Sequence, residues 1–73
     1  MKAKIYSATI HFSYEIRNRR ENATLQNVTA VVADGQDPRK NQYNTRKVLR
    51  INPTARIEKI ELKEFLSETA WTN

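Results

Sequence analysis

The chain contains no cysteine, one glycine and one histidine among its 73 residues. Without cysteine there can be no disulfide, thiolate metal site, iron–sulfur cluster or cysteine nucleophile. Phosphate-binding loops and the dinucleotide-binding fingerprint each need several glycines, which the chain lacks. No apolar run approaches the roughly 18 residues of a membrane span. These absences predict a protein that has no cofactor, does not enter a membrane and is stabilised by packing alone.

Residues that could carry out catalysis are also scarce. His11 is the only histidine, and it lies between Thr9 and Ser13 on the expected polar face of a strand. Most hydrolytic chemistry needs a nucleophile, a base and an orienting group, and one histidine without cysteine cannot build a conventional zinc site. The interleaved acids and lysines from Glu58 to Glu68 are typical of a solvated surface. We therefore expect a non-enzymatic protein with no metal site and no small-molecule substrate.

The length of the chain predicts one domain over residues 1–73. Residues 1–3 and 67–73 are expected to fray, except that Trp71 is large enough to fold back over an open edge of the core. The segment Met1–Tyr6 has the charges of a signal peptide, but polar residues interrupt the apolar stretch that should follow. The expected location is the cytoplasm.

Strict alternation of apolar and polar residues predicts a long, half-buried strand from Lys4 to Arg17. A polar run over residues 18–22 then predicts a hairpin connection of about five residues. The second strand, from Ala23 to Ala33, has a weaker pattern, which indicates partial cover on both faces. The apolar face of the first strand consists of Tyr6, Ala8, Ile10, Phe12, Tyr14 and Ile16.

A helix is predicted to begin at Pro38. Asp37 can cap its first turn, Gly35 supplies a turn before it, and Asn52 followed by Pro53 ends it. A helical wheel separates a basic half from a thin apolar half. The apolar half of the wheel consists of Asn41, Thr45, Val48, Leu49 and Ile51.

The segment 57–66 follows neither the period of a strand nor that of a helix. A strand with a bulge near Lys59 would place Ile57 with Ile60 and Leu62, while a C-terminal helix remains an alternative. The predicted fold is α+β, a small ββαβ domain in which a three-stranded sheet carries one helix packed on one face. The strand order stays open, and a parallel pair would require a right-handed crossover.

The pattern most suggestive of function is a basic stripe on the predicted helix, in a stretch from Pro38 to Ile57 that has no acidic residue. Clustered cations of this kind bind the phosphates of DNA or RNA. A second basic cluster lies in the hairpin. The candidate residues are Arg39, Lys40, Tyr43, Arg46, Lys47 and Arg50 on the helix and Arg17, Arg19 and Arg20 in the hairpin. No specific nucleic-acid-binding consensus is present, and a solvated surface is the plain alternative.

A competing hypothesis starts from the sheet, since one helix leaves a sheet face and at least one strand edge without cover. A homodimer, or a protein partner that adds a strand, would satisfy the open edge. This hypothesis makes the chain a protein-interaction or inhibitor module. The residues expected on the uncovered face are Ile5, Ser7, Thr9, His11, Leu25, Asn27, Thr29 and Val31.

Overall fold

The computed structural model describes residues 2–70 and shows one three-stranded sheet with one α-helix, which confirms the α+β class. A single-turn 3₁₀ helix, η1, precedes the α-helix. None of the described helices is long and apolar enough to cross a membrane. The elements are β1 (Lys2–Ile16), β2 (Arg19–Ala33), η1 (Pro38–Lys40), α1 (Gln42–Leu49) and β3 (Arg56–Ala70).

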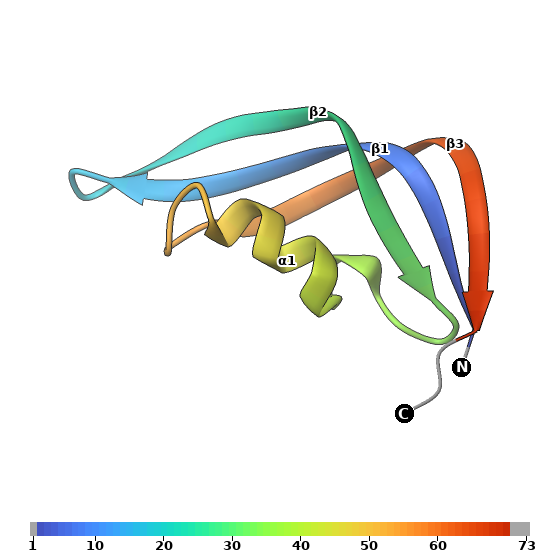
Figure 1. Cartoon of the computed structure of the whole chain (residues 1–73). Coiled ribbons are helices and arrows are strands. Elements are labelled where there is room, and N and C mark those ends of the chain that lie inside the picture. Colours follow the sequence, from blue (N-terminus) through green and yellow to red (C-terminus); the bar gives the residue numbers. More distant parts are fainter. Residues whose placement is uncertain (1, 71–73) are drawn as a thin grey trace.

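The sheet has the order β2-β1-β3, and both strand pairs are antiparallel. No parallel crossover is therefore needed among the described strands. All three strands bend sharply towards the end of the sheet where the chain begins, and α1 lies beneath the arch that they form (Figure 1). This arrangement leaves β2 and β3 as edge strands and encloses β1 between them.

The connection between β1 and β2 is a two-residue turn instead of the predicted five-residue loop. Ile16 pairs directly with Arg19, and the two turn residues Arg17 and Asn18 have φ values of 49° and 64°. Positive φ at both central positions is the geometry of a type I′ turn, whose twist matches that of a hairpin. The polar run after Asn18 misled the prediction, because these residues pair with β1 although they are hydrophilic.

A bulge in β2 overturns part of the predicted face assignment. Ala8 pairs with Val28, but Ile10 pairs with Leu25, so β2 contains one extra residue between these pairs. Asn27 lies there with a φ of 57°. The extra residue shifts the alternation, so Leu25 packs against the core instead of lying on the uncovered face.

β3 has the predicted irregularity. His11 pairs with Lys59 while Phe12 pairs with Ile57, so the bulge expected near Lys59 is confirmed, as is the strand over residues 57–66. Two further register shifts lie nearer the end of the strand. Three irregularities in one strand explain why its sequence follows no simple period.

The main core joins the sheet to α1. Ile10 and Phe12 of β1, Val48 of α1 and Ile57 of β3 form one buried cluster. Burying a side chain of this size contributes about 1.5–3 kcal/mol, so this cluster holds the helix against the sheet. A second, smaller cluster at the other end of the strands consists of Ala3, Val31 and Ala33, which places Val31 in the interior and not on an open face.

The predicted continuous helix from Pro38 is divided in two. Asp37 caps η1 through its carboxylate, but Asn41 then takes an extended conformation, with φ of −64° and ψ of 130°. The side chain of Asn41 accepts hydrogen bonds from the backbone N–H groups of Tyr43 and Asn44, so it is the N-cap of α1. The α-helix ends at Leu49, before the predicted stop at Asn52–Pro53, and turns complete the connection to β3.

The ends of β1 and β3 are more ordered than the sequence predicts. Lys2 pairs with Ala70 and Ala3 with Thr69, so the sheet includes segments that were expected to fray. Pairing between two ends that are distant in sequence supplies the hydrogen bonds that a free terminus lacks. The predicted role of Trp71 lies outside the described residues.

Candidate nucleic-acid interface

The exposed side of α1 carries a compact basic surface. Tyr43, Arg46, Lys47 and Arg50 line a shallow depression of about 240 Å³ with no acidic side chain in its lining. We call these four residues the basic face. It contains four of the nine predicted candidate residues, and it lies on one regular helix and the residue that ends it.

The opposite side of the helix fixes the orientation of the basic face. Asn44 and Val48 are buried, with 0% and 1% of their surfaces exposed, and they lie one helical turn apart. Asn44 binds the outer edge of β2, and Val48 enters the main core. Because both anchors face the sheet, Arg46 and Arg50 are directed away from it.

Tyr43 is held in place by contacts with two elements. Its hydroxyl is hydrogen-bonded to the Oγ1 atom of Thr29 on β2 at 3.2 Å. The ammonium group of Lys47 lies over the ring, 4.7 Å from its centroid. The hydrogen bond to Thr29, followed by the positive charge of Lys47, lowers the pKa of Tyr43. The ring is therefore a fixed part of the basic face although it is 45% exposed.

Ion pairing distinguishes the basic face from several other cations of the chain. Ion pairs join Arg19 to Glu21, Arg20 to Glu15 and Arg39 to Asp37, whereas no ion pair in residues 2–70 includes Arg46, Lys47 or Arg50. Acidic side chains cancel part of the local field and compete with an incoming phosphate. The charges of the basic face are thus available to an anionic ligand.

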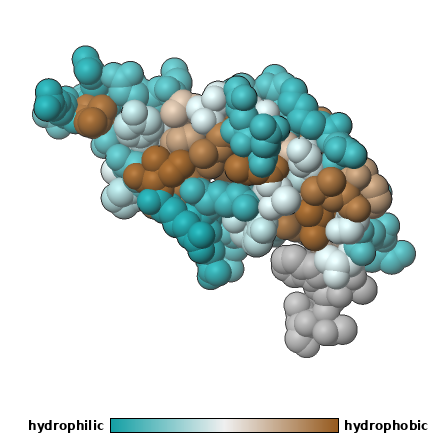
Figure 2. Space-filling view, turned by 45° about the horizontal axis from the view of Figure 1, so that its top comes forward, coloured by the Kyte–Doolittle hydropathy of each residue, from teal (hydrophilic) through white to brown (hydrophobic). Residues whose placement is uncertain are grey.

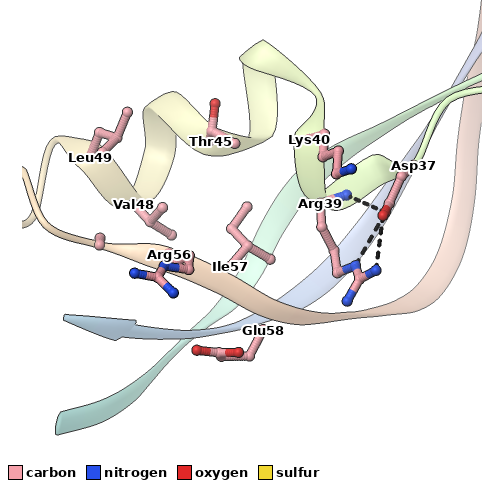
Figure 3. Close-up of a pocket in the computed structure, with 10 residues that line it drawn as sticks. Asp37, Arg39, Lys40, Thr45, Val48, Leu49, Arg56, Ile57 and Glu58 are labelled. Atoms are coloured by element: carbon pink, nitrogen blue, oxygen red, sulfur yellow. Dashed lines mark hydrogen bonds and ion pairs between the residues drawn. The ribbon is translucent and has the colours of Figure 1, made fainter. Parts of the chain in front are cut away.

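Arg39 and Lys40 belong to a different surface. They lie on η1 and line a groove of about 460 Å³ between η1, α1 and the start of β3 (Figure 3). Two hydrogen bonds tie the Arg39 guanidinium to Asp37, at 3.2 and 2.9 Å. These bonds from Arg39 lower the pKa of Asp37. The predicted stripe therefore combined residues of η1 with residues of α1, and the break at Asn41 separates the two groups.

The groove itself has an apolar floor and a rim of mixed charge. Val48 of α1 points towards Ile57 of β3, while the Glu58 carboxylate points away from the helix (Figure 3). Leu49 adds apolar surface to the lining. Arg39, Lys40 and Arg56 are accompanied by Asp37 and Glu58 in the lining. A surface with this balance has no strong preference for an anion, so the groove is a weaker candidate for phosphate than the basic face.

The hairpin arginines have separate roles in the structure. The Arg20 guanidinium donates to the Oγ atom of Ser13, to a carboxylate oxygen of Glu15 and to the carbonyl oxygen of Thr54, at 3.1, 3.1 and 2.9 Å. It therefore ties the hairpin to the segment that leads into β3. Arg17 occupies the type I′ turn, and Arg19 is paired with Glu21. The hairpin forms the far tip of the molecule, beyond the helix (Figure 1).

His11 and Ser13 of β1 each contact a glutamate of β3. His11 Nε2 contacts a carboxylate oxygen of Glu61, while the Ser13 hydroxyl donates to Glu58 at 2.5 Å. The histidine and the serine thus engage different acids and not each other. No group of three or more histidine, aspartate or glutamate side chains within residues 2–70 is placed to hold a metal ion.

The second candidate surface lies on β3. Leu62, Phe65 and Leu66 are each about half exposed, and the Phe65 ring meets Tyr6 edge-on with the ring centroids 5.6 Å apart. On the face shown in Figure 2, hydrophobic side chains gather in separate patches that hydrophilic ones interrupt. The β3 residues are the clearest exposed apolar group on the sheet, and their strand has an open edge.

Sequence reasoning missed two residues that build the basic face. Asn44 was assigned to neither half of the helix, although its burial fixes the helix rotation. Thr29 was placed on an uncovered face, whereas it binds Tyr43. Asparagine within a helix at 41 and again at 44 was the available signal, because an interior asparagine is unfavourable there unless its side chain makes a specific hydrogen bond.

Comparison with known proteins gives no match: no protein-family model, curated protein or solved structure is similar enough to this chain to be assigned as a relative.

Proposed function

We propose that this protein is a small non-enzymatic binding protein that contacts nucleic-acid phosphates through the basic face. One observation carries the proposal: Arg46, Lys47 and Arg50 lie together on a rigid helix without an acidic partner among the described residues. Cations in such an arrangement release the counterions condensed on a phosphate backbone. The net charge of +5 favours the same partner through long-range attraction.

We further propose that the protein works in the cytoplasm, has a ββαβ fold that needs no cofactor and performs no chemistry on its ligand. The hairpin arginines Arg17 and Arg19 lie at a tip that a long nucleic acid could reach, so they are secondary contacts in the proposal. Arg20 contributes to the fold, because its guanidinium is occupied by contacts within the chain.

Salt dependence of binding tests the proposal. Three neutralised phosphates predict a slope of about −2.7 in a plot of log K against log salt for duplex DNA, or about a 40-fold loss of affinity from about 50 mM to about 200 mM salt. Fluorescence anisotropy with labelled DNA and RNA of mixed sequence measures this slope. The double variant Arg46→Glu, Arg50→Glu should abolish the salt-sensitive binding while its urea midpoint changes little.

A charge-matched control separates the site from the overall charge. Lys4→Glu combined with Lys59→Glu makes the same change in net charge at two exposed positions on the sheet, outside the basic face. This control should retain most of the affinity. Equal losses in the two double variants would show that only net charge matters, and absence of binding at low salt would refute the proposal.

The exposed group on β3 supports a second candidate function, association with another copy of the chain along the free edge of β3. Leu62, Phe65 and Leu66 supply apolar area, and the edge offers unpaired backbone groups. The bulges of β3 oppose it, because they interrupt the regular ladder that strand addition requires. Sedimentation at rising protein concentration tests this candidate: a dimer that Phe65→Lys dissociates would support it, and a monomer throughout would refute it.

A further inference from the structure

The contacts that Tyr43 makes with Thr29 and Lys47 indicate which nucleic acids the basic face can bind. The ring is held at its hydroxyl by Thr29, at 3.2 Å, and the Lys47 ammonium covers the ring at 4.7 Å from the centroid. The covering cation and the hydrogen bond come from different elements, α1 and β2. A ligand group that stacks on the side of the ring covered by Lys47 must first displace this side chain.

Proteins that bind single strands without sequence preference depend on bases that stack on exposed aromatic rings, at about 1–3 kcal/mol per base. If a base stacked on the covered side of Tyr43, it would break the cation–π contact with Lys47. The Lys47 ammonium group would then move away from the phosphate backbone of the ligand. The other largely exposed aromatic side chain among the described residues is Phe65, on β3 and outside the basic face. The basic face therefore offers phosphate contacts with little provision for stacked bases.

The backbone positions that carry the cations, in contrast, are held at a fixed spacing. Arg46 and Arg50 are four residues apart, which is about 6 Å along a helix axis. The helix between them is fixed by Val48 in the core and by Asn44 on the edge of β2. A rigid double helix presents phosphates at constant spacing and at twice the axial charge density of one strand, whereas a single strand must be ordered before its phosphates fit.

We infer that the basic face binds the phosphate backbone of a double helix in preference to a single strand, with Tyr43 as a positioning residue that holds Lys47 over its ring. This inference rests on the proposed function and narrows it to a class of ligand. DNA and RNA duplexes share the required phosphate chemistry. Phosphate contacts carry no direct sequence information, so we expect no preference for a base sequence.

The test uses the full chain and labelled probes of one mixed sequence: a DNA duplex, an RNA duplex and the separate single strands. The expected result is at least about tenfold tighter binding of one or both duplexes at equal salt, with a salt slope near −2.7 for DNA. Comparison of the two duplex probes shows whether the basic face prefers a DNA or an RNA backbone. Tighter binding of either duplex than of its single strands supports the inference.

Tyr43 variants test the positioning role. Tyr43→Phe retains the ring and loses the hydrogen bond to Thr29, so duplex affinity should fall several-fold while the fold is retained. Tyr43→Leu removes the ring, and the affinity for single strands should fall by no larger a factor than the affinity for duplexes. If single strands bind as tightly as duplexes, or if Tyr43→Leu weakens them selectively, the inference is overturned although the proposed function stands. Failure of all four probes to bind at low salt would overturn both.

Discussion

The side-chain amide of Asn44 forms hydrogen bonds with both backbone groups of Val31. Its Oδ1 atom accepts from the Val31 N–H, and its Nδ2 atom donates to the Val31 carbonyl oxygen, each at 2.8 Å. The same Nδ2 atom also donates to the carbonyl oxygen of Pro38. Asn44 thus takes the place of a neighbouring strand at one position on the outer edge of β2, and it joins the helix, the sheet and η1 at a single point.

Replacement of Asn44 by alanine should destabilise the protein by about 2–4 kcal/mol, because two backbone groups of Val31 lose their partners in a buried position. Urea unfolding followed by circular dichroism measures the change. Gln42→Ala is the control, since Gln42 is exposed in the same helix. A loss below about 1 kcal/mol would contradict the role assigned to Asn44.

This contact illustrates why the rotation of the helix could not be predicted. The sequence gives a clear basic half, but the apolar half contains only three strongly apolar residues: Val48, Leu49 and Ile51. Of these, Val48 is buried, while Leu49 and Ile51 are about half exposed. An asparagine that forms hydrogen bonds with a strand edge replaces the missing apolar contacts, and such a contact depends on tertiary structure that the pattern does not encode.

Val48 should contribute more stability than its neighbour Leu49. Val48→Ala leaves a cavity between Ile10, Phe12 and Ile57 and should cost about 1–3 kcal/mol. Leu49→Ala removes a larger side chain that is half exposed, and should cost less than about 1 kcal/mol. Urea midpoints of the two variants provide the comparison. A reversed order would mean that Leu49, and not Val48, anchors the helix.

The irregularities of the sheet were predictable in part. The broken pattern of residues 57–66 pointed correctly to a bulge near Lys59, because Ile57 was out of phase with Ile60 and Leu62. In β2 the shift at Asn27 was not foreseen, although Leu25 and Val28 have the same spacing as Ile57 and Ile60. The weak pattern of this segment was interpreted as partial cover on both faces, which placed Leu25 on the face opposite Val28. A bulge is therefore hidden in a sequence where apolar residues at both even and odd positions also fit a strand that is covered on both faces.

Asn27 should tolerate glycine and resist valine. Its φ of 57° lies in the left-handed region, which asparagine and glycine adopt more readily than other residues. Asn27→Val should cost about 1–2 kcal/mol, whereas Asn27→Gly should be close to neutral. Gln26→Val places the same side chain on the adjacent exposed residue as a control. If both valine variants lost the same stability, the backbone strain at Asn27 would not be the cause.

The sequence predicted the residues of the basic face, but it also assigned to the same surface residues that lie elsewhere. Arg46, Lys47 and Arg50 share a face as the helical period requires. Arg39 and Lys40 were added because the wheel was continued through Asn41, whose extended backbone breaks the helix. The sequence signal for that break was present, since asparagine is among the strongest N-cap residues, but Asp37 and Pro38 gave an equally good start four residues earlier.

The contact between His11 and Glu61 should give the protein a specific sensitivity to acid. The hydrogen bond from His11, followed by the one from Lys63, lowers the pKa of Glu61 from its ordinary value of 4.5, and the charge of Lys59 acts in the same direction. A carboxyl group whose pKa is lower in the folded than in the unfolded chain adds stability at pH values above the unfolded pKa. That contribution is lost as the pH falls through the folded pKa.

Thermal unfolding of the native protein and of Glu61→Gln should therefore differ near neutral pH and converge in strong acid. Glu64→Gln is the control on the same strand, because Glu64 forms no ion pair among the described residues. A difference between the native protein and Glu61→Gln that persisted unchanged in acid would show that the glutamate acts through packing and not through its charge.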